Sequence, residues 1–330
     1  MSGVDLFFVL SGFLITGIFY ETRTDPLYYK KFYARRALRI FPVFYFFAAV
    51  MFVVGSHWKL SHLSLLFYVG WPVELIWPGA ILSSPLRIVH LWSLSAEEQF
   101  YMVWPLLMAK VRRPIVLCVG GFVLALSLRI LIVRFGVNEG WAYAFLPCRM
   151  DGLMIGAAIA LLWRSPRKQK LQRLSPSVCA IAASGVILTL WLARDSSGAP
   201  IVRTLQLSLI AATYGAVLVI ALIHPKIFSV AILRMFGKYS YGMYLFHLPL
   251  MSLLMRMKPM LSWAYLPICL VLNLGVAALS FHFFEQPILR LKKYFAYGVS
   301  APGVSRAKMQ PGGIGGDELA DRAMVAPITT

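Results

Sequence analysis

Long apolar stretches alternate along the chain with short clusters of basic residues. Nine of the stretches are close to the length of about 20 residues that an α-helix needs to cross the hydrocarbon core of a membrane. This pattern predicts an all-α protein, a polytopic transmembrane helical bundle with about nine spans. The predicted spans cover residues 4–20, 40–56, 91–109, 114–133, 144–163, 177–193, 204–223, 239–255 and 264–284.

A further apolar stretch, residues 63–82, is interrupted by Pro72, Glu74 and Pro78. If it crossed the membrane, the basic residues at 110–113 would lie on the outer side, against the tendency of Lys and Arg to remain in the cytoplasm. We therefore expect a re-entrant or interfacial segment, where protein or water satisfies the polar groups of an irregular backbone.

The basic clusters between the spans predict the orientation of the chain, because they follow the positive-inside pattern. This places the C-terminus in the cytoplasm. Residues 1–297 then form one membrane domain. Residues 298–330 are rich in Gly, Pro and Ala without any periodicity, and we expect them to form a disordered cytoplasmic tail.

Composition supports the membrane interpretation. Of the 330 residues, 59% are hydrophobic and 14% are charged, whereas about a quarter of a soluble domain is charged. The net charge of +19 would indicate a nucleic-acid partner in a soluble chain. Here the basic residues lie between apolar spans, so we expect no nucleic-acid binding. The cysteines are scattered, and neither metal-ligand spacing nor a Gly-rich phosphate loop occurs, so we expect no metal.

The stretch from His90 to Tyr101 places several polar side chains at the beginning of an apolar span. Ionisable groups are costly there unless protein or water surrounds them, so they indicate a functional site. Glu97 and Glu98 diverge by about 100° around a helix, and at least one should face the interior and pair with an arginine or orient a histidine. His90 is either a general base or a solvated or capping histidine at the membrane interface.

Polar residues near other span ends have a functional and a structural interpretation. Arg36 and Arg39 share a helix face at spacing i, i+3, and they either hold the chain at the cytoplasmic surface or bind a phosphate-bearing donor. Asp5 is either a site residue or an acid that complements the dipole of its helix. Arg149 and Asp151 are either a boundary pair or the wall of a site.

Three more residues have a notable position. Ser11 precedes Gly12, and small residues of this kind let two helices approach closely. His247 lies on an aromatic helix, where it is either a core histidine with satisfied hydrogen bonds or a catalytic one. Arg129 is a charge within the predicted span 114–133.

Several segments form recognisable motifs: Gly3-Val-Asp-Leu-Phe-Phe-Val-Leu-Ser-Gly-Phe-Leu-Ile, Arg36-Ala-Leu-Arg39-Ile-Phe-Pro, His90-Leu-Trp-Ser-Leu-Ser-Ala-Glu-Glu-Gln-Phe-Tyr, Gly237-Lys-Tyr-Ser-Tyr-Gly-Met-Tyr-Leu-Phe-His247 and Glu285-Gln-Pro287. Together they resemble the acyltransferase 3 family of bacterial membrane O-acyltransferases, in the family's order and over about residues 3–290. The resemblance implies a helical membrane bundle that takes an acyl group from a cytoplasmic donor, usually acyl-CoA. The acyl group then passes to a hydroxyl of a glycan or another acceptor.

The resemblance also implies a site and a location. We expect a bacterial inner-membrane enzyme, surrounded by membrane lipid, that transfers acetyl from acetyl-CoA to a cell-surface glycan or a lipid-linked glycan. Such transfer needs a base, donors for an oxyanion and a cationic grip on the donor's phosphates. The implied catalytic residues are His90, Glu97 and Glu98, and Arg36 and Arg39 are the implied donor-binding residues. Further site candidates are Asp5, Ser11, Trp92, Arg149, Asp151, Tyr241 and His247.

One feature departs from the family pattern. The family's first helix, with its proposed catalytic histidine, normally precedes the motif at Gly3, whereas only Met1 and Ser2 precede it here. We therefore expect a chain without that helix, and an inactive truncated remnant is one alternative to the enzyme. The other is a proton-coupled secondary transporter that uses Asp5 or the carboxylates near residue 97. The sequence leaves the acceptor, the acyl chain length and the oligomeric state open.

Overall fold

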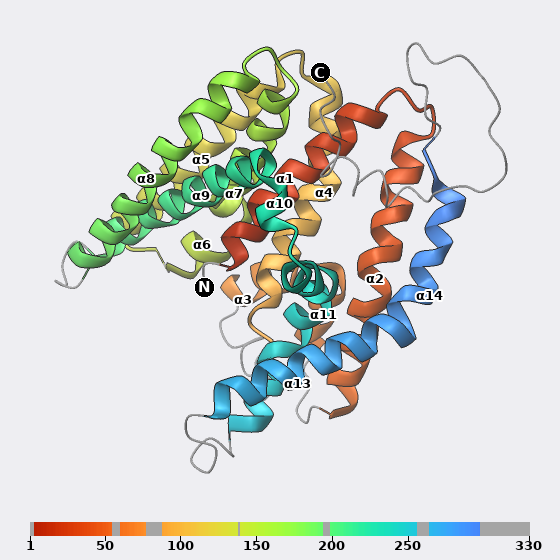
Figure 1. The fold of residues 1–330 in the computed structure, drawn as a ribbon. Coiled ribbons are helices and arrows are strands. Elements are labelled where there is room, and N and C mark those ends of the chain that lie inside the picture. Colours follow the sequence, from red (N-terminus) through yellow and green to blue (C-terminus); the bar gives the residue numbers. More distant parts are fainter. Residues whose placement is uncertain are drawn as a thin grey trace, which may run out of the picture. The chain divides into compact units, whose positions relative to one another are not determined.

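A computed structural model of the chain describes residues 3–54, 60–76, 88–137, 139–193, 199–255 and 264–297. Within these ranges the regular structure is helical and no strand occurs (Figure 1). The all-α prediction is therefore confirmed. The chain divides into two compact units: the first takes Met1–Tyr20, Lys59–Leu82 and Val89–His224, and the second takes Glu21–Trp58, Ser83–Ile88 and Pro225–Thr330.

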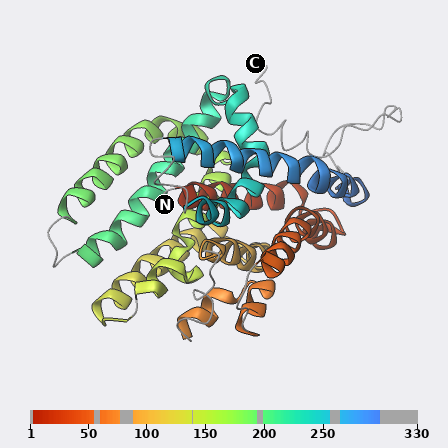
Figure 2. The ribbon, with the colours of Figure 1, turned by 90° about the horizontal axis from the view of Figure 1, so that it is seen from below.

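The helices of the first unit pack around α7. Helices α4, α5 and α9 contact α7, and α8 lies alongside α9, as Figures 1 and 2 both show. Val9, Ile159 and Val219 form a buried apolar core between α1, α7 and α9. The elements of this unit are α1 (Gly3–Thr22), η1 (Leu60–Phe67), α3 (Gly70–Ile76), α4 (Leu91–Lys110), α5 (Pro114–Arg134), α6 (Glu139–Ala144), α7 (Leu146–Trp163), α8 (Lys168–Leu192) and α9 (Ala199–Ile223). Helix α1 belongs to the unit as far as Tyr20.

Helices α1 and α7 cross with their backbones in contact. A side chain at Gly12 of α1 would meet the carbonyl oxygen of Leu153, and a side chain at Gly156 of α7 would meet that of Val9. Gly152 lies one turn before Gly156 and also faces α1. The Gly-x-x-x-Gly spacing on α7 thus permits the close approach that small residues give membrane helices. The predicted close approach at Gly12 is confirmed.

Two longer helices of the second unit, α11 and α13, lie against each other, and α11 also contacts α2. The hydroxyl of Tyr241 donates to the carbonyl oxygen of Ile40 at 2.9 Å, and Nδ2 of Asn273 donates to that of Met243 at 3.1 Å. The elements are α2 (Tyr28–Val54), α10 (Pro225–Phe228), α11 (Ala231–Leu254), α13 (Tyr265–Ser280), the π-helical η4 (Phe281–Glu285), α14 (Gln286–Leu289) and η5 (Arg290–Phe295).

In the described part of the chain, seven helices are long and apolar enough to cross a membrane, fewer than the nine predicted. The two other predicted spans are the helices α4 and α11, but both are more polar. Helix α4 carries Glu97 and Glu98, and α11 carries Arg234 and Lys238. Most residues of α4 are buried, so protein rather than lipid surrounds its carboxylates.

Several helices extend beyond the apolar residues on which the predictions depend. Helix α2 begins at Tyr28 and α8 at Lys168, well before the predicted starts at residues 40 and 177. Lys and Arg are good helix formers, so a helix can continue into a basic cluster outside the hydrocarbon. The basic residues at 30–39, which precede the predicted span 40–56, are therefore helical.

The interrupted apolar stretch forms the short helices η1 and α3, and neither is long enough to cross a bilayer. The rest of this predicted re-entrant segment, residues 77–82, lies outside the described residues. The predicted tail, residues 298–330, also lies outside them.

Candidate functional site

A buried carboxylate joins α1 to α4. Glu97 is 2% exposed, and it accepts hydrogen bonds from the hydroxyls of Ser11 and Tyr101. The two hydroxyl oxygens are 3.0 Å apart. Tyr101 lies one turn beyond Glu97 and so shares its helix face. Further along the same two helices, Nε1 of Trp104 donates to the hydroxyl of Thr16 at 2.8 Å.

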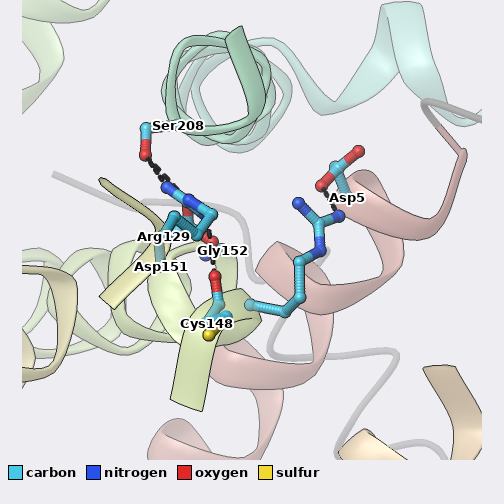
Figure 3. Close-up of polar contacts among 7 residues, drawn as sticks. Asp5, Arg129, Cys148, Asp151, Gly152 and Ser208 are labelled. Carbon is cyan, nitrogen blue, oxygen red and sulfur yellow. Dashed lines mark hydrogen bonds and ion pairs between the residues drawn. The ribbon is translucent and has the colours of Figure 1, made fainter. Parts of the chain in front are cut away.

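Two ion pairs are made by α7 with neighbouring helices (Figure 3). Arg149 donates from Nη2 to Oδ1 of Asp5 on α1 at 2.5 Å. Arg129 of α5 donates to Oδ2 of Asp151 at 2.8 Å and to the carbonyl oxygen of Cys148 at 2.7 Å. Both arginines are buried, with exposures of 1% for Arg149 and 0% for Arg129.

Ser208 adds a third helix, α9, to the pair of Arg129 and Asp151. Its hydroxyl accepts from Arg129 and donates to Oδ2 of Asp151, where the oxygens are 2.8 Å apart. The backbone nitrogen of Gly152 donates to the other oxygen of Asp151 at 3.0 Å. Charges inside a membrane bundle persist when such partners compensate them, so this network fixes α5, α7 and α9 to one another.

Aromatic rings surround the guanidinium of Arg149. Its central carbon lies 5.6 to 5.9 Å from the ring centres of Phe8, Trp92 and Tyr143, within the range of a cation–π interaction. The ring of Trp92 is 5.0 Å from that of Tyr143. The predicted candidates Asp5, Trp92 and Arg149 thus come together in one cluster.

His90 and Glu98 are also buried in the first unit, with exposures of 8% and 6%. His90 directly precedes α4, and its carbonyl oxygen accepts from the backbone nitrogen of Ser93 at 3.2 Å. Because Glu98 is next to Glu97 in a helix, the two carboxylates leave α4 in different directions. All first-unit candidates therefore lie on α1, α4 and α7 or directly before α4.

The predicted donor-binding arginines lie on α2 in the second unit. Arg36 is half-buried, and its guanidinium carbon is 5.8 Å from the ring centre of Phe32. Arg39 is exposed and lies close enough to the buried Glu285 for an electrostatic interaction. The Arg-x-x-Arg motif and the Glu-Gln-Pro motif thus meet within this unit.

Two other candidates lie on α11 of the second unit. Tyr241 is bound to the backbone of α2, as described above. Nδ1 of the half-buried His247 donates to the carbonyl oxygen of Tyr244 at 2.6 Å, which places the ring proton on this nitrogen. No group of three His, Cys, Asp or Glu that could hold a metal ion occurs among the residues that the structure describes.

Comparison with known proteins identifies the family. The sequence model of the acyltransferase domain of the acyltransferase 3 family matches residues 1–282. The chain belongs to this family. The predicted family is therefore confirmed, and membership favours an acyltransferase over the transporter alternative.

Two relatives show how far the similarity extends. The chain is 33% identical over 321 residues to peptidoglycan O-acetyltransferase OatA of Listeria monocytogenes, covering 87% of this chain and 51% of that protein. It is 27% identical over 330 residues to O-acetyltransferase OatA of Staphylococcus aureus, covering 89% of this chain and 53% of that protein. The chain therefore spans about half the length of these relatives. No solved structure matches it significantly.

Several residues of these clusters were not among the predicted candidates, among them Tyr101, Arg129, Tyr143 and Ser208. A charge within an apolar span was a sufficient signal for Arg129. Tyr101 closes the motif that begins at His90, one turn after Glu97. Tyr143 and Ser208 carry no such signal, because tyrosines and serines are common in membrane helices and only the tertiary structure shows their partners.

Proposed function

We propose that this enzyme transfers an acetyl group from acetyl-CoA to a hydroxyl of a cell-surface glycan, with peptidoglycan as the first acceptor to test. The observation that carries the proposal is the 33% identity to a peptidoglycan O-acetyltransferase over 87% of this chain. The wider proposal places the protein in the bacterial plasma (inner) membrane with its C-terminus in the cytoplasm. Its apolar exposed helix faces, such as that of α5, would contact lipid.

The acceptor hydroxyl would react near His90, Glu97 and Glu98. An alcohol needs a base to take its proton as it attacks a carbonyl carbon, and these three buried groups can accept a proton. Glu97 is held by Ser11 and Tyr101, which suits a group that positions a hydroxyl. Glu98 and His90 are then the proposed bases.

The donor would bind at Arg36 and Arg39. Coenzyme A carries phosphates, which arginine binds through charge-assisted hydrogen bonds. The two side chains lie one helical turn apart at the basic end of α2, and Glu285 lies near Arg39. This arrangement supports a role in orienting a polyanionic donor beside the membrane.

The experiment measures the transfer of labelled acetyl from acetyl-CoA to peptidoglycan in membranes that contain the full chain. The variant Glu98→Gln replaces the carboxylate by an amide of similar size, so this variant tests the proposed role of Glu98 as a base. The matched control is His282→Gln, an exposed side chain of the second unit. We expect transfer by the wild-type chain and the control, and a loss of about 100-fold or more for Glu98→Gln. Equal losses in both variants would contradict the site assignment, and no transfer to any glycan by the wild-type chain would contradict the function.

A further inference from the structure

The two buried arginines of the first unit differ in how many acceptors they have. Arg129 donates to three oxygens from its two Nη atoms. Arg149 donates to one, on Asp5. Nε of both arginines and Nη1 of Arg149 have no hydrogen-bond partner in the described part of the chain. Arg149 therefore keeps an entire amino group and its Nε unused although it is buried.

Unused donors in a buried position indicate an absent acceptor, because a buried polar group without a partner destabilises the protein. The rings of Phe8, Trp92 and Tyr143 attract the positive charge of Arg149, but they accept a hydrogen bond far more weakly than an oxygen does. The group that the site lacks is thus an oxygen acceptor.

The charges around Arg149 narrow the class of this acceptor. Arg149 and Asp5 together are neutral, and so are Arg129 and Asp151. A permanent anion would add an uncompensated charge to this buried region, which is costly. A carbonyl oxygen adds none in the ground state, and it becomes negative only while a tetrahedral intermediate exists. This favours the carbonyl oxygen of an acyl group over a phosphate or a carboxylate.

We propose that Arg149 is a catalytic residue whose Nε and Nη1 bind the carbonyl oxygen of the acyl group during transfer; this rests on the proposed function. The acceptor's hydroxyl oxygen forms a bond to the carbonyl carbon, a base takes the hydroxyl proton, and the π electrons move to the carbonyl oxygen. Arg149 stabilises the resulting oxyanion. When the electron pair returns, the bond from carbon to the sulfur of the thioester donor breaks, and the thiolate leaves with its electrons and is then protonated.

The neighbours of Arg149 suit this role. Asp5 holds Nη2 and thereby orients the guanidinium, and a donor that is oriented in advance needs no reorganisation in the transition state. The three rings keep water away, and low polarity strengthens the interaction of a cation with a developing anion. Asp5 is in this view a positioning residue.

The test compares Arg149→Lys with the double variant Asp5→Asn/Arg149→Met in the acetyl-transfer assay. Lys preserves the charge that Asp5 needs but lacks the planar set of donors. We expect Arg149→Lys to lower kcat by about 100-fold or more while KM for acetyl-CoA changes little. The double variant leaves no buried charge unpaired. If Asp5 and Arg149 only stabilised the structure, this neutral pair could replace them and the double variant would be active. We expect it to be inactive, and an active double variant or an unchanged kcat in Arg149→Lys would overturn the proposal.

A second measurement does not depend on how the variants fold or on transfer activity. S-methyl thioacetate carries the same neutral carbonyl oxygen as the acyl group, and it should raise the Tm of the detergent-solubilised wild-type chain. We expect a rise of about 2 °C at several times its dissociation constant, and less with ethyl methyl sulfide, which lacks only the carbonyl oxygen. No rise, or an equal rise with ethyl methyl sulfide, would overturn the role of Arg149. Transfer failure of the wild-type chain together with this rise would instead contradict only the proposed function.

Discussion

The crossing of α1 and α7 gives a sharp prediction, because backbone rather than side chains forms it. We expect Gly156→Ala to lower the free energy of unfolding by about 2 kcal/mol, in the range that overpacking of a close contact costs. The added methyl would collide with the carbonyl oxygen of Val9 and approach the backbone nitrogen of Phe13. Neither atom can rotate away, so the helices must separate.

The control is Gly120→Ala in α5. A methyl there would meet nothing within 4 Å, and Ala is a better helix former than Gly, so we expect a gain of up to about 1 kcal/mol. Both free energies are measured by denaturant unfolding in mixed micelles. If the Gly156→Ala variant were as stable as the Gly120→Ala variant, the close crossing of α1 and α7 would be refuted.

The double variant Gly12→Ala/Gly156→Ala refines this prediction. Gly12 meets the carbonyl oxygen of Leu153 at the same crossing, so one separation of the helices relieves both collisions. The double variant should therefore lose less unfolding free energy than the sum of the losses in the two single variants, as expected for sites in contact. Full additivity would mean that the two glycines act at independent contacts.

Two other predictions concern the buried ion pair and the donor site. Asp151→Asn removes the charge that compensates Arg129 and should destabilise the fold by about 3–5 kcal/mol, whereas Ser208→Ala, which leaves the pair intact, should cost about 1 kcal/mol. The yield and Tm of monodisperse protein test this order, and equal stabilities would contradict the network. Arg39→Gln should raise KM for acetyl-CoA by about tenfold with little change in kcat, since one charge-assisted contact is worth about 1.5 kcal/mol or more. Unchanged initial-rate kinetics would show that Arg39 only stabilises the helix end.

The sequence was sufficient for the fold class and for the family, because hydropathy and motif order are properties of the chain itself. It overestimated the number of apolar spans because motif residues such as Glu97 make α4 too polar to resemble a lipid-exposed helix. It also placed the starts of α2 and α8 too late, since hydropathy detects where a helix enters or leaves the hydrocarbon and not where the helix itself begins or ends. The first error comes from using lipid as the only environment for a helix that other helices also surround, and the second comes from ending each helix at the hydrocarbon boundary.

The site was only partly predictable for a different reason. The energetic cost of burying a charge indicates single residues such as Asp5 or Glu97 as candidates, but it does not predict which residues bind them. An arginine or a histidine was expected beside the carboxylates at 97 and 98, but nothing in the sequence indicated the hydroxyls of Ser11 and Tyr101 that donate to Glu97. Arg149 was predicted at a span end, and only the structure shows it enclosed by rings from three helices.

The first motif of the chain gains a physical explanation from these contacts. In lipid, apolar burial does not drive helices together, so packing and polar contacts must hold α1 in place. Asp5 pairs with α7, Ser11 and Thr16 bind α4, and Gly12 touches the backbone of α7. From residue 5 to residue 16 a helix rises about 16 Å, roughly half the hydrocarbon thickness. Helix α1 is therefore fixed between α4 and α7 by the same residues that carry the candidate chemistry. Any functional test at Asp5 or Ser11 must accordingly measure stability alongside activity.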